Sequence, residues 1–529
     1  MTKPVVIVGA GPTGLTAAIL LARYGVETLV LERWEGIYPQ PRAVHLDGEI
    51  HRILARLGVA DDFTAISRPC LGLRLVDRNM EVLAEFHRRP LGRNGYPDAN
   101  MFDQPELEAI LRTALNRHPC VSVRGDVGVT AVAGETGGVR VEFTDRTTGA
   151  AESVRARYVL GCDGANSMVR TAIGATMRDL NFEQRWLVVD VATDAELGEW
   201  EGVHQVCDPG RAATYMRIGK TRYRWEFRLR PGETAGDYDH IDRLHRLIRP
   251  WIGAIPVEEL NLVRVAEYVF RAQIADRWRA GRVFLLGDAA HLTPPFIGQG
   301  MGAGLRDATN LTWKLAGVLA GEFPEEVLDT YETERKPHAR AMIRLAKVTG
   351  IAMTDGGDLG DLVRRLITPH LHRVPGFHAL VTGGETPPLH RSELVARRRL
   401  FRGRVGSLVP NAVLDDGRRY DDVAAGRYAI VSTVEPTPAQ HAQIRECGGL
   451  VVSAGPGSDL RRWLRLGRTR AALVRPDGTV QRSGRDLSAL CSAMPRFRTA
   501  DATIQGDAPA APAVAKCLGP QGNDPRCSR

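Results

Sequence analysis

Apolar residues near the N-terminus follow the order strand, turn, helix, strand. Residues 4–8 form a short apolar run, a glycine-rich turn follows, and Leu15–Tyr24 repeats apolar positions at helical spacing. The apolar run Glu27–Leu31 completes a predicted βαβ unit. Two further strand-like runs, Ser153–Leu160 and Arg282–Leu286, each end at a Gly/Asp turn and lead into segments of helical character. We therefore predict one domain assembled from three separated pieces of the chain.

The middle of the chain changes to the period of two that is typical of β-strands. Between residues 181 and 268 aromatic and polar side chains alternate, which predicts an antiparallel sheet with one covered face. Residues 325–350 predict one long helix, and short apolar runs after residue 400 predict a small α/β module. The predicted parts are a discontinuous domain (1–180 and 269–350), an inserted sheet domain (181–268 with part of 70–100), a helical connection (351–400), the small module (401–500) and a mobile tail (501–529).

Composition places the chain among ordinary folded proteins. Of its 529 residues, 43% are hydrophobic and 25% charged, which argues against disordered and fibrous classes. The eight cysteines are dispersed with no CxxC pair, so we expect a reducing, cytoplasmic environment and neither a disulfide framework nor a bound metal. Glycines interrupt the N-terminal apolar run, so no membrane or targeting segment is expected. The net charge of +8 suits an anionic cofactor or substrate. The densest basic cluster, Arg461–Arg470, is interpreted as the solvated face of a helix rather than as a nucleic-acid site.

The motif that carries the first chemistry is Gly9-Ala-Gly11-Pro12-Thr13-Gly14, between the first strand and the first helix. Gly9 permits a tight turn, Gly11 lets backbone N–H groups approach a pyrophosphate at the helix N-terminus, and Gly14 allows close packing of helix on strand. Glu32 ends the second strand, where a carboxylate accepts hydrogen bonds from ribose hydroxyls. Because an acid repels a 2′-phosphate, this motif predicts FAD or NAD rather than NADP.

A second motif decides between these nucleotides. Residues 287–301, Gly287-Asp288-Ala-Ala-His-Leu-Thr-Pro-Pro295-Phe-Ile-Gly298-Gln-Gly300-Met301, resemble the GD motif of FAD-dependent aromatic hydroxylases. The resemblance implies that Asp288 contacts the ribityl chain of FAD. It also implies that the Pro-Pro and Gly-Gln-Gly segments, with Pro295, Gly298, Gly300 and Met301, lie against the isoalloxazine ring.

Further motifs of the same family occur in the same order along the chain. Residues 161–170, which contain Asp163 and Arg170, resemble the DG motif that serves FAD and transient NAD(P)H binding. Pro41-Arg42-Ala resembles the segment whose arginine reaches the FAD diphosphate, and the segment at Gln104 resembles the one whose glutamine contacts FAD. Arg33, beside Glu32, is also expected at the cofactor. The resemblance extends from residue 4 to about residue 350.

The resemblance implies a fold and a reaction. The expected fold is α/β: a Rossmann-type FAD domain, an inserted antiparallel sheet as in p-hydroxybenzoate hydroxylase, and a C-terminal thioredoxin-like domain without CxxC. The implied reaction is hydroxylation of a phenolic substrate by O2 through a C4a-hydroperoxyflavin, with NAD(P)H as a transient co-substrate. The partners are thus a small aromatic substrate, NAD(P)H and O2, with no nucleic acid or membrane; a homodimer is one expected assembly.

The substrate and the catalytic residues stay open at this stage. Residues 42–49 and the Gly-Gln-Gly-Met form look most like 3-(3-hydroxyphenyl)propionate hydroxylases, and Gly302 departs from the Asn usual in polyketide-tailoring relatives. Hydroxylation of a polycyclic or antibiotic aromatic, and a non-catalytic flavoprotein that binds an aromatic ligand, are the alternatives. His45 and Asp47 are candidate bases for the phenol, with helix-cap or turn roles as alternatives. Tyr215 and Arg222 are candidates on the sheet, although alternation does not show which face looks inward.

Overall fold

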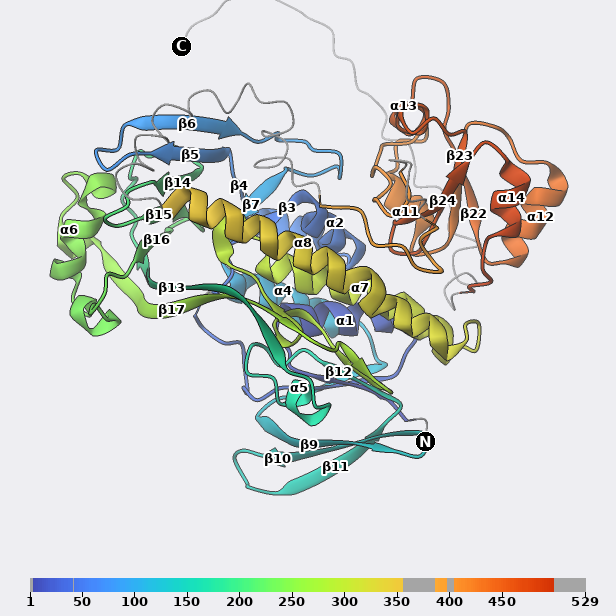
Figure 1. Ribbon diagram of the computed structural model, residues 1–529, viewed down its shortest axis with the longest axis horizontal. Coiled ribbons are helices and arrows are strands. Elements are labelled where there is room, and N and C mark those ends of the chain that lie inside the picture. The colour runs from blue at the N-terminus through green and yellow to red at the C-terminus, as the bar shows by residue number, and fades with distance from the viewer. Residues whose placement is uncertain (1–2, 41, 355–385, 397–403, 499–529) are drawn as a thin grey trace, which may run out of the picture.

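A six-stranded sheet brings together the N-terminal βαβ unit and two segments from farther along the chain. The computed structural model describes residues 3–40, 42–354, 386–396 and 404–498 (Figure 1). Within the sheet β1 pairs in parallel with β12 and β2, and only β18 runs antiparallel to its neighbour. In spatial order the strands are β18 (Arg279–Ala280), β19 (Val283–Leu285), β12 (Tyr158–Gly161), β1 (Val5–Val8), β2 (Thr28–Leu31) and β8 (Val121–Arg124).

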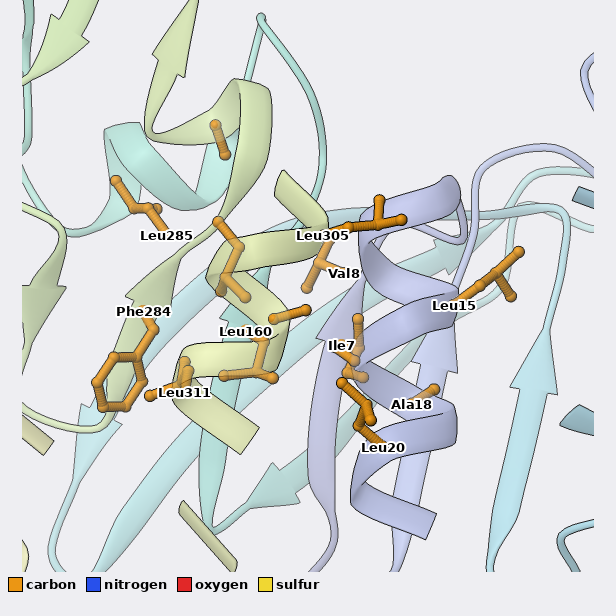
Figure 2. Packing of buried hydrophobic residues seen from close by; sticks show 14 of the residues in the cluster. Ile7, Val8, Leu15, Ala18, Leu20, Leu160, Phe284, Leu285, Leu305 and Leu311 are labelled. Atoms are coloured by element: carbon orange, nitrogen blue, oxygen red, sulfur yellow. The ribbon is translucent and has the colours of Figure 1, made fainter. Parts of the chain in front are cut away.

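Two helices cover this sheet and form the main core with it. The side chains of α1 (Pro12–Arg23) and α7 (Gly300–Leu319) are almost all buried, and the two helices pack side by side (Figure 2). Ile7 and Val8 of β1 contact them together with Leu160 and Phe284, all fully or nearly fully buried. A parallel sheet of this kind needs both faces covered, which explains the continuous apolar runs in its strands.

The apolar run Ser153–Leu160 is divided between two sheets rather than forming one strand. β11 (Ala151–Ala156) belongs to a three-stranded antiparallel sheet, and β12 begins at Tyr158. Between them the Arg157 N–H donates to Pro4 O, which bends the chain into the parallel sheet. The sheet of β11 also contains β9 (Val127–Glu135) and β10 (Gly138–Asp145).

An eight-stranded sheet contains the alternating segment. Its strands, in spatial order, are β20 (His291–Leu292), β17 (Asn261–Ala275), β13 (Met177–Ala192), β16 (Arg222–Arg228), β15 (Ala213–Arg217), β14 (Val203–Val206), β5 (Gly72–Val76) and β6 (Val82–His87). One strand pair, β14 with β5, is parallel and the other neighbours are antiparallel.

The two faces of this sheet have different surroundings. Helix α6 (Ile241–Ile252), which the alternation did not predict, packs its Leu244, Ile248 and Trp251 on the outer face. On the inner face Trp186 contacts Phe296 of the 287–301 motif, with ring centroids 5.8 Å apart. The inner face therefore looks toward the segments expected at the flavin ring.

Short elements connect the two sheets. Helices α2 (Gly48–Arg56), α3 (Ala60–Ile66), α4 (Gln104–Leu115) and α5 (Met168–Ala172) surround the six-stranded sheet. A three-stranded sheet of β3 (His45–Asp47), β7 (Ala99–Met101) and β4 (Arg68–Pro69) lies between the two larger ones. This small sheet positions His45 and Asp47.

Helix α8 (Asp329–Thr354) runs across the molecule from the C-terminal module to the eight-stranded sheet (Figure 1). At one end Arg228 donates to Thr354 O, and at the other Arg475 donates to the fully buried Glu334 at 2.9 Å. No described helix is both long and apolar enough to cross a membrane. The predicted helical connection lies mostly outside the described residues, at 355–385 and 397–403, and so does the predicted tail, 501–529.

The C-terminal module is a four-stranded mixed sheet flanked by helices. Its strands follow the order β22 (Leu450–Ser453), β21 (Ala429–Ser432), β23 (Ala471–Val474) and β24 (Val480–Gly484), with only β21 and β22 parallel. The helices are α11 (Tyr420–Ala424), α12 (Pro438–Glu446), α13 (Asp459–Leu466) and α14 (Leu487–Ser492).

Candidate active site

The glycine turn before α1 is closely packed at Gly9 and Gly14 and open at Gly11. Gly9 has a φ of +104°, and a Cβ there would lie 2.4 Å from Cys162 O. A Cβ on Gly14 would lie 2.0 Å from Gly9 O, so Gly14 must be glycine for the helix to pack on the turn. Gly11, which precedes Pro12 at the N-terminus of α1, has no atom within 4 Å of its Cβ position. This open space in front of a helix N-terminus suits a pyrophosphate.

Glu32 lies beside this turn, at the end of β2. Its Oε2 accepts from Ala10 N–H at 2.6 Å and its Oε1 from Trp34 N–H at 3.0 Å, so the carboxylate is fixed next to the glycine turn. Each carboxylate oxygen has a second acceptor site for a ribose hydroxyl. Arg33 points differently: its carbonyl accepts from Arg146, and its guanidinium lies 6.0 Å from the Trp34 ring.

Two turns precede α7, one at Gly287 and one at Gly298, and the first carries Asp288. Gly287 has a φ of +60° and Gly298 a φ of +61°, and a Cβ on Gly287 would lie 2.9 Å from Thr13 Oγ1. This contact joins the 287–301 motif to the start of α1. Asp288 is exposed, and among the described residues no group donates a hydrogen bond to its carboxylate. The surrounding protein nevertheless desolvates this carboxylate enough to raise its pKa.

The carboxylate of Asp307, by contrast, is hydrogen-bonded through both of its oxygens to other residues of the protein. It accepts from Gly287 N–H, from Arg335 Nε at 2.8 Å, and pairs with His291 Nε2 at 2.8 Å. Asp307 is completely buried, and Arg335 and His291 lower its pKa against the cost of burial. His291 therefore helps to fix the turn that presents Asp288.

Asp163 and Arg170 also have protein partners. Asp163 accepts from Ser167 Oγ and Val169 N–H at the start of α5, and burial raises its pKa. Arg170 donates to Ala289 O at 3.1 Å, which ties the 161–170 motif to the turn at Asp288. Asp163 therefore stabilises the start of α5, and Arg170 stabilises the turn that carries Asp288.

The remaining predicted cofactor residues surround the same region. Gln104 Oε1 accepts from Ala43 N–H at 2.7 Å, so this glutamine fixes the segment that carries Arg42. The Arg42 side chain is exposed, over the Tyr38 ring at 4.6 Å, while its neighbour Pro41 lies outside the described residues. Pro295 begins a short 3-10 turn, and Gly300 and Met301 begin α7.

These observations fit FAD. A dinucleotide requires donors and acceptors of the kind found here: the open pyrophosphate position at Gly11, the fixed ribose acceptor Glu32, and the Asp288 carboxylate, to which no described residue donates.

Comparison with known proteins agrees with this geometry. The family model "FAD binding domain" matches residues 2–346. A probable NADH-specific resorcinol 4-hydroxylase of Rhodococcus jostii is 34% identical over 96% of both chains. A 3-(3-hydroxy-phenyl)propionate/3-hydroxycinnamic acid hydroxylase of Burkholderia vietnamiensis is 35% identical, over 81% of this chain and 78% of that protein. The chain belongs to the FAD-dependent aromatic hydroxylases.

The fold is shared with solved flavoproteins. The flavin-dependent monooxygenase PieE, solved with FAD and substrate, has a TM-score of 0.78 and 24% identity over 93% of this chain and 98% of that one. This confirms the predicted fold class and, with the family match, FAD as the cofactor. The name of the Rhodococcus jostii relative specifies NADH.

We predict that Asp288→Ala weakens FAD retention much more than it weakens folding. The wild-type carboxylate has no described protein donor to lose, so unfolding should change by less than about 0.5 kcal/mol, as for other exposed sites. Flavin content after gel filtration and urea unfolding of the flavin-free protein measure the two effects. Asp163→Ala is the matched control, because it removes a helix-capping carboxylate and should lower stability. Equal losses in Asp288→Ala would assign that residue a structural role.

Tyr215 is not at the active site, which corrects the sequence-based prediction. It packs on the outer face of the sheet, 5.8 Å from the Trp251 ring of α6 and 5.4 Å from Trp225. Burial there raises its pKa. The period of two was correct, but only the position of α6 shows that Tyr215 faces away from the cofactor.

Asp47 is a helix cap rather than a free base. Its Oδ1 accepts from Glu49 and Ile50 N–H, and its Oδ2 accepts from Gln299 at 2.7 Å and Arg306 at 2.6 Å. Although burial opposes ionisation, Arg306 and these hydrogen bonds lower its pKa. Asp47 thus holds α2 against the start of α7.

His45 lies directly against the loop that contains Gly298. A Cβ on Gly298 would meet His45 Nδ1 at 2.3 Å, and the imidazole Nε2 lies 2.8 Å from Arg88 Nη1. Burial and Arg88 lower the pKa of His45 to about 3, so the ring is neutral at physiological pH. Arg222, the fourth candidate, is on the inner face and pairs with Asp103 at 2.6 Å.

Two residues near the site were not predicted. Arg88 follows β6 beside His45, and Glu226 lies on the inner face of β16. Alternation places Glu226 on the same face as Arg222 and Arg224, so the sequence does indicate that these three residues lie together. No local pattern marks Arg88, because its relation to His45 depends on the pairing of distant segments.

Proposed function

We propose that this hydroxylase acts with NADH on a mononuclear phenol that carries a carboxylate side chain, of the 3-(3-hydroxyphenyl)propionate type. The relatives support a phenolic substrate and NADH, since one is named an NADH-specific resorcinol 4-hydroxylase and others 3-(3-hydroxy-phenyl)propionate hydroxylases. The carboxylate is supported by a feature of the structure, the cation of Arg88.

Arg88 is a partly buried arginine that has no counter-ion in the described part of the chain. No carboxylate of the described residues lies within 4 Å of its guanidinium, and its buried Nε has no hydrogen-bond partner there. Its Nη1 contacts His45 Nε2 and Cys70 Sγ, which fixes the guanidinium beside the loop at Gly298. A guanidinium with free donors binds carboxylates in a bidentate manner. This single observation favours a carboxylate-bearing phenol over resorcinol.

Different residues of the chain bind the cofactor and orient the substrate. The N-terminus of α1 and Glu32 hold the dinucleotide, while Asp288 is available for a polar group of the cofactor chain. FAD bound there would supply the redox chemistry, the transfer of electrons from NADH to O2, and O2 would supply the oxygen atom that is transferred. The inner face of the eight-stranded sheet closes the site against water, and His45 with Arg88 orients the substrate at the loop of Gly298.

The proposed function is tested by NADH oxidation under air with and without 3-(3-hydroxyphenyl)propionate. Strong stimulation with a catechol product would support it. Flavin absorbance without stimulation by this phenol or by resorcinol would direct the search to polycyclic aromatics or to a non-catalytic binder.

We predict that Arg88→Gln raises the KM for 3-(3-hydroxyphenyl)propionate ~10- to 100-fold, the value of one charged hydrogen bond of about 1.5–3 kcal/mol. The KM for resorcinol, which has no carboxylate, should change less than about threefold. The matched control is Arg89→Gln, since Arg89 is exposed and pairs with Asp98. An equal effect of Arg88→Gln on both substrates would contradict carboxylate binding.

A further inference from the structure

The inner face of the eight-stranded sheet carries a carboxylate that none of the contacts described above uses. Glu226 lies on β16, with Val188 of β13 and Thr214 of β15 as its cross-strand neighbours. Its side chain is 13% exposed, and within the described part of the chain no group donates a hydrogen bond to it. Buried carboxylates are normally paired or hydrogen-bonded, so a partner from outside the chain is expected.

The register of the sheet places Glu226 between two segments of the flavin site. Two residues along β16 in one direction, Arg228 pairs with Trp186, which contacts Phe296 of the 287–301 motif. Two residues in the other direction, Arg224 donates to Arg42 O at 2.9 Å. Residues two apart on a strand share a face about 7 Å from one another. Glu226 therefore faces the space between the Phe296 loop and the Arg42 segment.

The other charged groups on this face are already engaged. Asp190 and Arg224 form a bidentate pair at 2.7 and 2.9 Å, both buried. Arg222 pairs with Asp103. On the same face Arg228 donates to Thr354 O, and Arg264 donates to the Tyr268 hydroxyl. The Arg224 Nη1 atom lies 4.0 Å from Glu226 Oε1, at the limit of an ion pair. Among the described strand residues of this face, Glu226 is thus the carboxylate to which no group donates a hydrogen bond.

We propose that Glu226 is the catalytic base that removes the proton from the phenol hydroxyl of the substrate. The phenol O–H bond breaks, an O–H bond forms on the Glu226 carboxylate, and the negative charge passes to the phenolate oxygen. The net charge of the cavity is unchanged, and the guanidinium of Arg224 remains beside the anion. The proton returns to solvent after the product leaves. This inference rests on the proposed phenolic substrate.

The electrostatic surroundings favour this transfer. Burial raises the pKa of Glu226, Asp190 raises it further, and Arg224 opposes both, while the facing Val188 and Thr214 carry no charge. A carboxylate with a raised pKa is a better match for the weakly acidic phenol. Because the base must be ionised, phenolate formation should be lost as the pH falls through this raised pKa.

The test compares wild type with Glu226→Gln, using 3-(3-hydroxyphenyl)propionate as the probe. Ultraviolet difference spectra of the bound probe at neutral pH should show phenolate in wild type and neutral phenol in the variant. Product formation should fall ~10²-fold or more, the usual contribution of a general base. With a nitro-substituted phenol, which ionises near neutral pH, the ratio of the variant rate to the wild-type rate should return most of the way to one. In the variant, activity on the original probe should rise only toward the pKa of the free phenol.

Two further variants keep the result interpretable. Glu183→Gln is the matched control, because Glu183 is 60% exposed on the adjacent strand and should behave as wild type. If Glu226→Gln does not fold, Glu226→Asp keeps a carboxylate displaced by one methylene; a lower rate with an unchanged acidic limb would support the base. Bound phenolate in Glu226→Gln, or an unaltered pH profile, would overturn the assignment. A wild type that no phenol stimulates would instead refute the proposed function.

Discussion

Gly11→Val should produce a folded but colourless protein. No atom lies within 4 Å of the Gly11 Cβ position, and its φ of −71° and ψ of 179° suit any residue, so the chain itself can accept the side chain. The valine would instead occupy the space in front of the α1 N-terminus. A pyrophosphate that loses two charge-assisted hydrogen bonds there loses about 3–6 kcal/mol, which is at least ~10²-fold in affinity.

Gly14→Val is the matched comparison for this prediction. Its Cβ would lie 2.0 Å from Gly9 O, so the backbone of the turn would have to move. We expect insoluble or strongly destabilised protein from Gly14→Val, and native-like circular dichroism with absent flavin absorbance from Gly11→Val. Yellow Gly11→Val protein at full flavin content would contradict the placement of the pyrophosphate at this turn.

The contrast between these two glycines shows what the sequence can predict about the cofactor site. The strand–turn–helix motif is local, and its glycines and Glu32 lie where the motif predicts. The motif also assigns Gly11 to the ligand and Gly14 to the packing of the helix, but it does not identify the atoms that the glycines meet. One of these contacts joins Gly9 to Cys162, and the two residues meet only after β12 pairs with β1.

Which face of the eight-stranded sheet looks toward the flavin-site segments was less predictable, for a related reason. A period of two separates the two faces of a strand but does not say which one is covered. Helix α6 decides this. Its apolar positions Leu244, Ile248, Trp251 and Ile252 follow helical spacing within the segment for which the alternation predicts strands. Recognising that helix would have placed Tyr215 under it and directed attention to Arg224 and Glu226.

Contacts between the C-terminal module and the FAD domain lie beyond any local pattern. Asp421 of α11 accepts two bidentate hydrogen-bond pairs from Arg52 and Arg56 of α2, at 2.6 to 2.9 Å. The side chains are 8%, 1% and 15% exposed, so water provides little alternative solvation. Nothing in the sequence around residue 421 indicates partners that lie more than 360 residues away.

Asp421→Ala should therefore strongly destabilise the folded protein. It leaves two arginines facing each other without their shared carboxylate, and loss of one partner of a buried ion pair costs about 3–5 kcal/mol. Arg52 would keep only its bond to Val409 O within the module, and Arg56 its bond to Asp477 O. Urea unfolding measures the loss, and Asp416→Ala, which removes a half-exposed carboxylate paired locally with Arg418, is the control.

The same carboxylate predicts an acid sensitivity of the folded protein. Although burial opposes ionisation, Arg52 and Arg56 hold the pKa of Asp421 well below its usual value. Its stabilisation is therefore complete above the unfolded-state pKa of about 4 and is lost as the pH falls toward the folded-state value. The free energy of unfolding of wild type should fall between pH 5 and pH 3 more steeply than that of Asp421→Asn, whose side chain does not titrate. Parallel curves for the two proteins would mean that the arginines do not depend on this charge, and that other contacts hold the C-terminal module in place.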